Sequence, residues 1–324
     1  MTALVVAENL TRRFGGGLFR HRAAVQAVTD VSLSIGRGEA VGLIGESGSG
    51  KSTIGRLLLG LIAPSGGRVL LDGVDLARIG GAELGRLRRR TQLVFQDPYS
   101  SLDPRRRVGA QIADGLAIHK LADGGERRAR VEALLAQVGL PAAHADRYPH
   151  EFSGGQRQRI GIARALATGP EFLVADEPVS ALDVSVQAQV LALLADLRTR
   201  LGLGLLFISH DLAVVRSLCD RVAVLYLGRI MEEGPAAAVL DRPRHPYTRA
   251  LLSAAPMIDV GRRRTRILLR GDPPSPADPS SGCVFRTRCP WALSACAAAV
   301  PPLQPVGAAW RSACIRDDIA FPEA

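Results

Sequence analysis

Several features are scarce or missing in this sequence, and each shortage excludes a class of protein. No run of about 18 or more apolar residues occurs in the 324 residues, which argues against a membrane-spanning helix. The first eight residues lack the basic and then apolar order of a signal peptide. We therefore expect a protein of the cytosol. A hydrophobic content of 47% is ample for the core of one large domain and a smaller one.

Lysine is nearly absent, although the formal net charge is +10. Lys51 and Lys120 are the only lysines, so arginine supplies almost all of the positive charge. Basic proteins can bind nucleic acid or anionic lipid. The excess of arginine over lysine instead indicates that the positive charge results from a compositional bias of the whole sequence. We expect no nucleic-acid partner, and we expect the arginine runs at 88–90, 105–107 and 262–264 to be solvated.

Local patterns predict an α/β core that is interrupted by a helical insert. Alternation with period two predicts a half-buried strand at 27–35, and helical spacing at 111–119 and 126–138 predicts an insert over about 98–162. A hairpin is predicted around Gly228. The further elements that we expect are strands at 4–6, 39–45, 66–73, 93–96, 172–176 and 205–209, and helices at 52–59 and 185–200.

The amino-acid composition changes near residue 255. The segment after it is rich in proline and contains four of the five cysteines. We therefore divide the chain into a main domain, 1–255, and a loop-rich C-terminal extension, 256–324.

A glycine-rich loop between a strand and a helix gives the first functional signal. Residues 45–52 fit the pattern G-x-x-x-x-G-K-[ST], in which backbone N–H groups and a helix N-terminus bind phosphates. We expect Lys51 to neutralise the β- and γ-phosphates of a nucleoside triphosphate and Ser52 to offer its hydroxyl to Mg²⁺. A chance glycine-rich turn is disfavoured because one of only two lysines falls here. The candidate nucleotide-binding residues are Gly45, Glu46, Ser47, Gly48, Ser49, Gly50, Lys51, Ser52 and Thr53.

Polar residues at the ends of other strands are the candidates for the chemistry. Asp176 ends an apolar strand, where a carboxylate is placed to hold Mg²⁺, and Glu177 is a candidate base for the attacking water. The alternative is that Asp-Glu-Pro at 176–178 caps a helix. Gln96 is placed to reach Mg²⁺ or the water, and His210 to contact the γ-phosphate, although a lone histidine is more often structural.

Together with Ser153-Gly154-Gly155-Gln156, these motifs resemble those of the ATP-binding-cassette (ABC) ATPases over roughly residues 1–240. The resemblance implies a P-loop NTPase (RecA-like) core with an antiparallel β subdomain and a helical insert. It also implies that Ser153, Gly154, Gly155 and Gln156 complete the ATP site of a partner domain. The loop 180–183 matches a further motif of the family, the D-loop, and makes Asp183 another candidate nucleotide-binding residue. Phe14 is the candidate for stacking on the adenine.

A narrower resemblance is to the oligopeptide/dipeptide permease branch. It is based on the segments 94–104, 176–185, 243–248 and 282–290, and the insertion at 15–20 resembles the second ATPase of the pair in those systems. It implies an ATP-hydrolysing subunit at the cytoplasmic face of the membrane. Its partners would be a second ABC ATPase, two transmembrane permease subunits and an extracytoplasmic substrate-binding protein.

The four cysteines of the extension leave three interpretations open. Cys283, Cys289, Cys296 and Cys314 are separated by 5, 6 and 17 residues. Zinc sites usually contain pairs two to four residues apart, and no such pair occurs here. Cys289-Pro290 is similar to the Cys-Pro of ferredoxin ligand runs, and wider spacing suits a [4Fe–4S] cluster. A [4Fe–4S] cluster, zinc and free thiols therefore all remain.

Two alternatives for the function also remain. One is a soluble ABC ATPase that acts on nucleic acid or ribosomes, supported only by the net charge of +10. The other is an importer for nickel or another small solute, because the transported compound cannot be read from a motor subunit.

Overall fold

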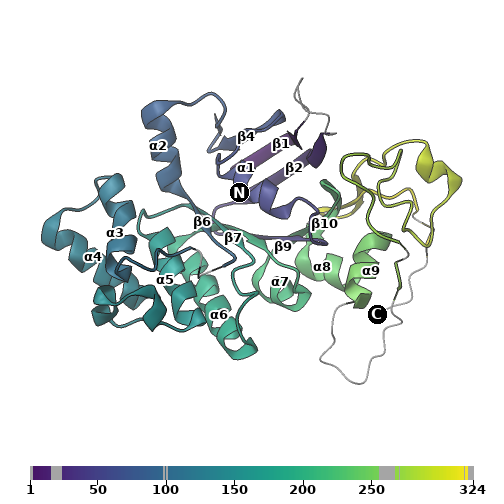
Figure 1. Cartoon of the computed structure of the whole chain (residues 1–324). Helices are drawn as coiled ribbons and strands as arrows, with labels where there is room; N and C mark the ends of the chain where they lie inside the picture. Colours follow the sequence, from purple (N-terminus) through teal and green to yellow (C-terminus); the bar gives the residue numbers. More distant parts are fainter. Residues whose placement is uncertain are drawn as a thin grey trace.

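Two β-sheets organise the chain (Figure 1). The computed structural model describes residues 3–15, 24–97, 99, 101–254, 267–269, 271–316 and 318–319. The larger sheet contains, in spatial order, β11 (Gln304–Gly307), β12 (Trp310–Ser312), β10 (Arg229–Pro235), β9 (Arg221–Tyr226), β3 (Ala40–Ile44), β8 (Gly204–Ile208), β7 (Phe172–Asp176) and β6 (Thr91–Val94). The smaller, antiparallel sheet contains β2 (Val25–Gly36), β1 (Ala3–Phe14), β4 (Gly66–Leu71) and β5 (Val74–Asp75).

The centre of the larger sheet is parallel and deeply buried. β3 pairs in parallel with β8 and β9, β8 with β7, and β7 with β6. All five residues of β3 and of β8 are buried, which explains why these segments are continuous apolar runs. The carboxyl ends of β3, β6, β7 and β8 therefore meet at one edge of the sheet, and each of the polar motifs follows one of these strands.

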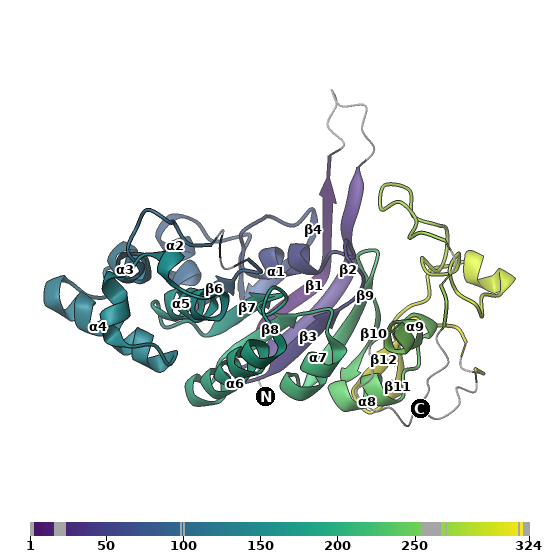
Figure 2. The same cartoon turned by 60° about the horizontal axis from the view of Figure 1, so that its bottom comes forward.

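Helices cover both faces of the larger sheet. α1 (Lys51–Leu58) packs against β2, β7 and β8, so it lies between the two sheets. On the opposite face, Figure 2 shows α6 (Val184–Leu201), α7 (Leu212–Leu218) and α8 (Ala236–Asp241) side by side. The remaining helices are α2 (Gly81–Arg90), α3 (Val108–Ile118), α4 (Gly124–Gln137), α5 (Gly154–Leu166) and α9 (Pro246–Ala254), with the 3₁₀ turns η1 (Ala142–Asp146), η2 (Pro149–Glu151) and η3 (Ser294–Ala297).

Two hydrophobic cores lie on the two faces of the larger sheet. One contains α1 and the smaller sheet, and the other contains the helical region and α6–α8. Neighbouring residues of β7 alternate between them: Val174 belongs to the first core, and Leu173 and Ala175 belong to the second. The strand period of two thus divides one apolar run between two cores.

The predicted α/β core, antiparallel subdomain and helical insert are confirmed, with three differences in detail. β1 runs to Phe14 instead of ending near residue 6, and α2 was not predicted. The extension is rich in loops, but its β12 pairs with β10 and so enlarges the main sheet. The boundary near 255 and the arginine run at 262–264 lie outside the described residues. No helix in the described part of the chain is long and apolar enough to span a bilayer.

Candidate nucleotide-binding site

The loop between β3 and α1 folds as a tight backbone cradle. Gly45 and Gly50 have φ values of +152° and +105°, which favour glycine. A Cβ atom on Gly45 would lie 2.1 Å from the carbonyl oxygen of Leu225, and one on Gly50 would lie 2.2 Å from that of Ala27. The glycines at these two positions are therefore required by close backbone packing.

Lys51 lies inside this cradle. Its side chain is buried, and its Nζ donates hydrogen bonds of 2.8 Å to the carbonyl oxygens of Gly45 and Glu46. Burial lowers the pKa of Lys51, whereas the charges of Glu177, Asp176 and Glu46 raise it. The first N–H groups of a helix have no partner within the helix. A cation and free N–H donors at the start of α1 fit the phosphates of a nucleotide.

Ser52 and Asp176 form a corner suited to a divalent cation. The Ser52 hydroxyl donates to Asp176 Oδ1 at 3.0 Å. Burial raises the pKa of Asp176, and the hydrogen bond from Ser52 opposes that rise. Hydroxyl and carboxylate oxygens are ligands that Mg²⁺ prefers, so these residues fit Mg²⁺ bound together with a nucleotide. Gln96, also a candidate ligand, donates to Glu177 instead.

Glu177 brings the three candidate catalytic residues together. Its Oε2 accepts a 2.9 Å hydrogen bond from Gln96 Nε2 and lies 3.4 Å from His210 Nδ1. These residues follow β6, β7 and β8, so the order of the strands creates the cluster. Glu177 has a φ of +48°, a left-handed conformation that is costly for a residue with a Cβ. Nothing in the sequence pattern predicted this strain.

The alternative interpretation of residues 176–178 as a helix cap is wrong. The next helix, α6, begins at Val184, and its N-cap is Asp183, whose carboxylate accepts from the Val186 N–H at 3.0 Å. Asp176 and Glu177 are thus free of a capping role.

The Ser-Gly-Gly-Gln segment begins α5 with a capping box. Ser153 Oγ accepts from the Gln156 N–H at 3.4 Å, and Gln156 Oε1 accepts from the Ser153 N–H at 3.0 Å. A Cβ atom on Gly155 would lie only 2.2 Å from Val186 Cγ1. Gly154, likewise, lies beside the side chain of Leu182. The segment 153–156 and Asp183 therefore meet where α5 packs on α6.

Phe14 lies at the end of β1 with 39% of its surface exposed, and the Arg12 guanidinium is 4.6 Å from its ring centre. An exposed aromatic face fits the expected adenine stack, which stays a prediction. Residues 16–20 of the neighbouring insertion lie outside the described residues.

Two residues that no sequence motif indicated contact the phosphate loop. The Glu46 N–H donates to Tyr247 Oη at 2.9 Å, and Arg288 Nη1 donates to Glu46 Oε2 at 2.8 Å. Tyr247 is the second residue of α9, and Arg288 belongs to the extension. Both fall in segments that resemble the permease branch, but sequence separations of 201 and 242 residues hide the contacts.

The four cysteines of the extension lie near one another. The Cys283 N–H donates to the Cys296 carbonyl oxygen at 2.8 Å. Burial raises the pKa of Cys289 to about 11, and charges on Cys314, Cys283 and Cys296 add to the rise. In the part of the chain that the structure describes, no group of three or more His, Cys, Asp or Glu side chains is placed to hold a metal ion, so neither the zinc nor the [4Fe–4S] interpretation gains support from it. The fifth cysteine, Cys219, is buried.

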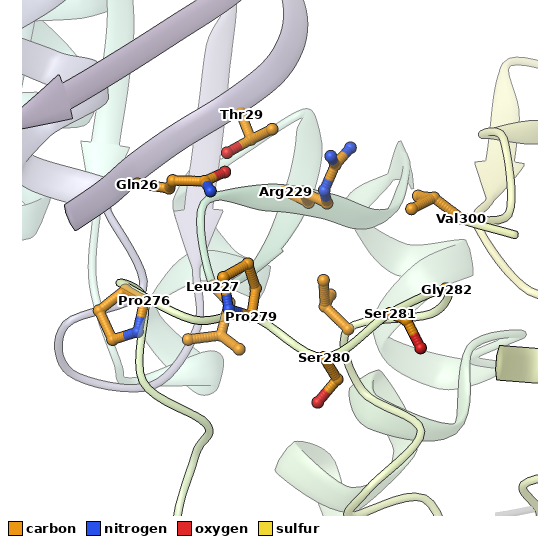
Figure 3. A pocket seen from close by; sticks show the side chains of 11 residues that line it. Gln26, Thr29, Leu227, Arg229, Pro276, Pro279, Ser280, Ser281, Gly282 and Val300 are labelled. Atoms are coloured by element: carbon orange, nitrogen blue, oxygen red, sulfur yellow. The ribbon is translucent and has the colours of Figure 1, made fainter. Parts of the chain in front are cut away.

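The extension also packs against the smaller sheet. A cavity of about 180 Å³ lies between β2, the β9–β10 turn and the extension (Figure 3). Gln26 and Arg229 line one side of the cavity, and Pro276 and Ser281 line the other. The Gln26 N–H donates to the Pro276 carbonyl oxygen at 2.9 Å, which fixes the extension to β2.

The fold and the site together define an ATP-binding cassette. Residues 28–180 match the family model described as ABC transporter, and residues 231–296 match that of the oligopeptide/dipeptide transporter C-terminal region. A Brucella ovis protein named as a peptide import ATP-binding protein is 57% identical over 307 residues, covering 94% of this chain and 97% of that protein. The oligopeptide transport ATP-binding protein AppF of Bacillus subtilis is 48% identical, covering 92% of each chain.

Solved structures agree. The ATP-binding cassette MJ0796, determined as a dimer in a post-hydrolysis state with ADP and Pi, has a TM-score of 0.64 and 32% identity, covering 72% of this chain and 98% of that chain. The protein cbiO1 of Clostridium perfringens has a TM-score of 0.65 and 29% identity, covering 74% of this chain and 91% of that chain. The chain belongs to the ABC transporter family of ATPases, in its oligopeptide/dipeptide branch.

Proposed function

We propose that this protein is the ATP-hydrolysing subunit of a peptide importer and works at the cytoplasmic face of the membrane. Its partners are a second ABC ATPase, two permease subunits and an extracytoplasmic substrate-binding protein. The observation that supports this best is the cluster of Gln96, Glu177 and His210 beside a complete phosphate loop, in a chain that also has the C-terminal region of this branch.

Each residue of the site has a separate role in this proposal. Bound ATP supplies the phosphoanhydride bond whose hydrolysis drives transport. Lys51 and the N–H groups at the start of α1 neutralise and orient the phosphates. Ser52 and Asp176 would hold Mg²⁺, and Gln96 is a further candidate ligand. Glu177 accepts a proton from the attacking water, and His210, beside the same carboxylate, contacts the γ-phosphate.

The segment 153–156 and Asp183 act on the nucleotide of the partner ATPase. Their own contacts lie at the meeting of α5 and α6, and the glycines leave the segment without bulky side chains. The dimeric structure of the related cassette MJ0796 supports an arrangement of two domains. Tyr99, in the loop after Gln96, is exposed, as is Phe95 just before Gln96, and we assign this loop to contact with a permease subunit.

We further propose that Cys283, Cys289, Cys296 and Cys314 hold a [4Fe–4S] cluster with a structural role. What supports it is that the Cys283 N–H donates to the Cys296 carbonyl oxygen and that charges on Cys314, Cys283 and Cys296 help to raise the pKa of Cys289. Iron content and visible absorbance of protein purified without oxygen test this proposal. Protein that lacks both iron and absorbance would exclude the cluster.

The nucleotide site is tested by exchanging the two lysines of the chain one at a time. Lys51→Ala removes the cation of the cradle and is expected to weaken ATP binding by roughly tenfold or more. Lys120→Asn is the matched control, because Lys120 lies after α3 with a φ of +52°, which asparagine tolerates. Unchanged ATP affinity of Lys51→Ala in a titration calorimeter would overturn the role of the loop.

The transported compound is tested in vesicles that contain the complete importer. Uptake of a labelled dipeptide and of a longer peptide is expected, and Lys51→Ala in this subunit should abolish it. Vesicles that import nickel or another small solute but neither peptide would refute the peptide assignment, while leaving the ATPase intact.

A further inference from the structure

The C-terminal extension contacts the phosphate loop, and the contact falls on one residue. Each polar group of Glu46 is hydrogen-bonded to another side chain. The N–H donates to Tyr247 Oη, the carbonyl oxygen accepts from Lys51 Nζ, and the carboxylate accepts from Arg288 Nη1. Glu46 is the second residue of the loop. The extension and α9 therefore contact the loop at its entry, one residue after Gly45.

A cluster of aromatic rings holds Arg288, the cationic partner of Glu46, in place. Phe285, which is fully buried, lies 5.3 Å from the ring of Tyr226 and 5.2 Å from that of Tyr247. Tyr226 and Tyr247 are 4.7 Å apart. Arg288 also donates to Tyr226 Oη at 3.4 Å. Rings from β9, α9 and the extension thus form one cluster, which aligns the Arg288 side chain with the loop.

The charges of the Arg288–Glu46 pair affect the binding of a charged ligand in the phosphate loop. The side chain of Arg288 is 9% exposed and that of Glu46 is 26% exposed, so water screens the pair only in part. A phosphate loop binds a polyanion, and an unpaired carboxylate on the loop would repel it. The guanidinium of Arg288 cancels this charge and draws the carboxylate to the side of the extension.

We propose that Arg288 is a positioning residue of the nucleotide site, which acts through Glu46 to keep the phosphate loop receptive to ATP. Arg288 lies between Cys283 and Cys289, so the cysteine-containing segment of the extension is part of the ATP site. The inference rests on the proposed role of residues 45–52 as the phosphate site.

The test uses the full chain and compares two arginines of the same segment. Arg288→Met keeps the length of the side chain and removes its charge, and is expected to raise the Kd and the KM for ATP about tenfold, with kcat changed less than about twofold. Arg286→Met is the control. Arg286 donates to the carbonyl and hydroxyl oxygens of Ser281 within the extension, so its loss should leave both constants unchanged.

A double variant separates an action through Glu46 from a general loss of structure. In the E46Q background the carboxylate charge is absent, so the further effect of Arg288→Met on ATP affinity should fall to about twofold or less. Arg288→Lys, which retains a charge, should fall between wild type and Arg288→Met. It also serves as the test variant if Arg288→Met does not fold, as judged by thermal denaturation.

Two outcomes would overturn the proposal. One is wild-type ATP affinity in a folded Arg288→Met or Arg288→Lys variant. The other is an effect of Arg288→Met that is equally large in the wild-type and E46Q backgrounds, because Arg288 would then act through the fold alone. Both differ from a failure of the phosphate site itself, in which Lys51→Ala would bind ATP normally.

Discussion

At the scale of single residues, three carboxylates near the phosphate loop have different environments and therefore different roles. Asp176 is partly buried and accepts a hydrogen bond from a hydroxyl, as suits a ligand of Mg²⁺. Glu46 is paired with Arg288. Glu177 contacts an amide and an imidazole and has a strained backbone, so it is the one placed to act on water.

Replacing Glu177 tests this assignment. Glu177→Gln should bind ATP but lower the rate of hydrolysis by about 10²–10⁴-fold, the usual contribution of a general base. Release of phosphate in a single turnover measures it. Glu171→Gln is the matched control, because Glu171 precedes the same strand, β7, at its other end, and the rate should be unchanged. Near-normal hydrolysis by Glu177→Gln would disprove the role.

At the scale of elements, a network of charges joins both sheets to α2. Glu171, just before β7, accepts from Arg90 at the end of α2 and from Arg37 in the turn before β3. Both arginines also bond Asp72, which follows β4. We expected the run 88–90 to be solvated. This expectation is wrong for Arg90, which is half-buried between two carboxylates.

This network predicts a loss of stability in acid. The Arg90 hydrogen bond lowers the pKa of Glu171, and although burial opposes the shift, Arg37 adds to it, so that the pKa falls to about 2. Because the pKa is lower in the folded state, the stabilisation is complete above the ordinary pKa near 4.5 and is lost as the pH falls towards 2.

Glu171→Gln should remove this dependence and cost about 1 kcal/mol at neutral pH, since the pair is partly exposed and screened. Urea denaturation at pH 6 and at pH 3 measures both effects. The exposed Glu83 of α2 provides the control, Glu83→Gln. An equal acid dependence in wild type and in Glu171→Gln would contradict the prediction.

Sequence patterns predicted the elements whose signals are local. β3, β7 and β8 are apolar runs that end in polar motifs, and the parallel order of β6, β7 and β8 explains the cluster at Glu177. β1 was predicted too short because its pairing with β2 shifts register after Ala7 and again after Leu10, which breaks the period of two. α2 contains two glycines and buries only Leu87, so it has little helical pattern. Arg288 could not be found because its partner is remote in sequence.

At the scale of the whole molecule, the extension is built into the main sheet. Trp310 of β12 donates from Nε1 to the buried Glu232 Oε1 at 2.9 Å, and its ring lies over Gly234, where a Cβ would be 2.8 Å from Trp310 Cδ1. Glu232 also accepts from the N–H groups of Arg244 and His245. One carboxylate on β10 thereby connects the sheet, the segment before α9, and the extension.

Removing the Trp310 ring should destabilise the whole fold. Trp310→Ala leaves a cavity and deprives Glu232 of a donor, so we expect a loss of about 3–5 kcal/mol in the free energy of unfolding. Chemical denaturation measures the loss. Val306→Ala on the exposed strand β11 is the control and should change stability by less than about 0.5 kcal/mol. A Trp310→Ala protein of wild-type stability would show that the extension is only loosely attached.

The pairing of β12 with β10 also determines which strand borders the sheet. Without it, β10 would present a row of unpaired backbone donors and acceptors to other copies of the chain. With it, the border passes to β11, an exposed strand of four residues in which Pro305 has no N–H to offer. The extension therefore protects this side of the sheet against aggregation by strand addition.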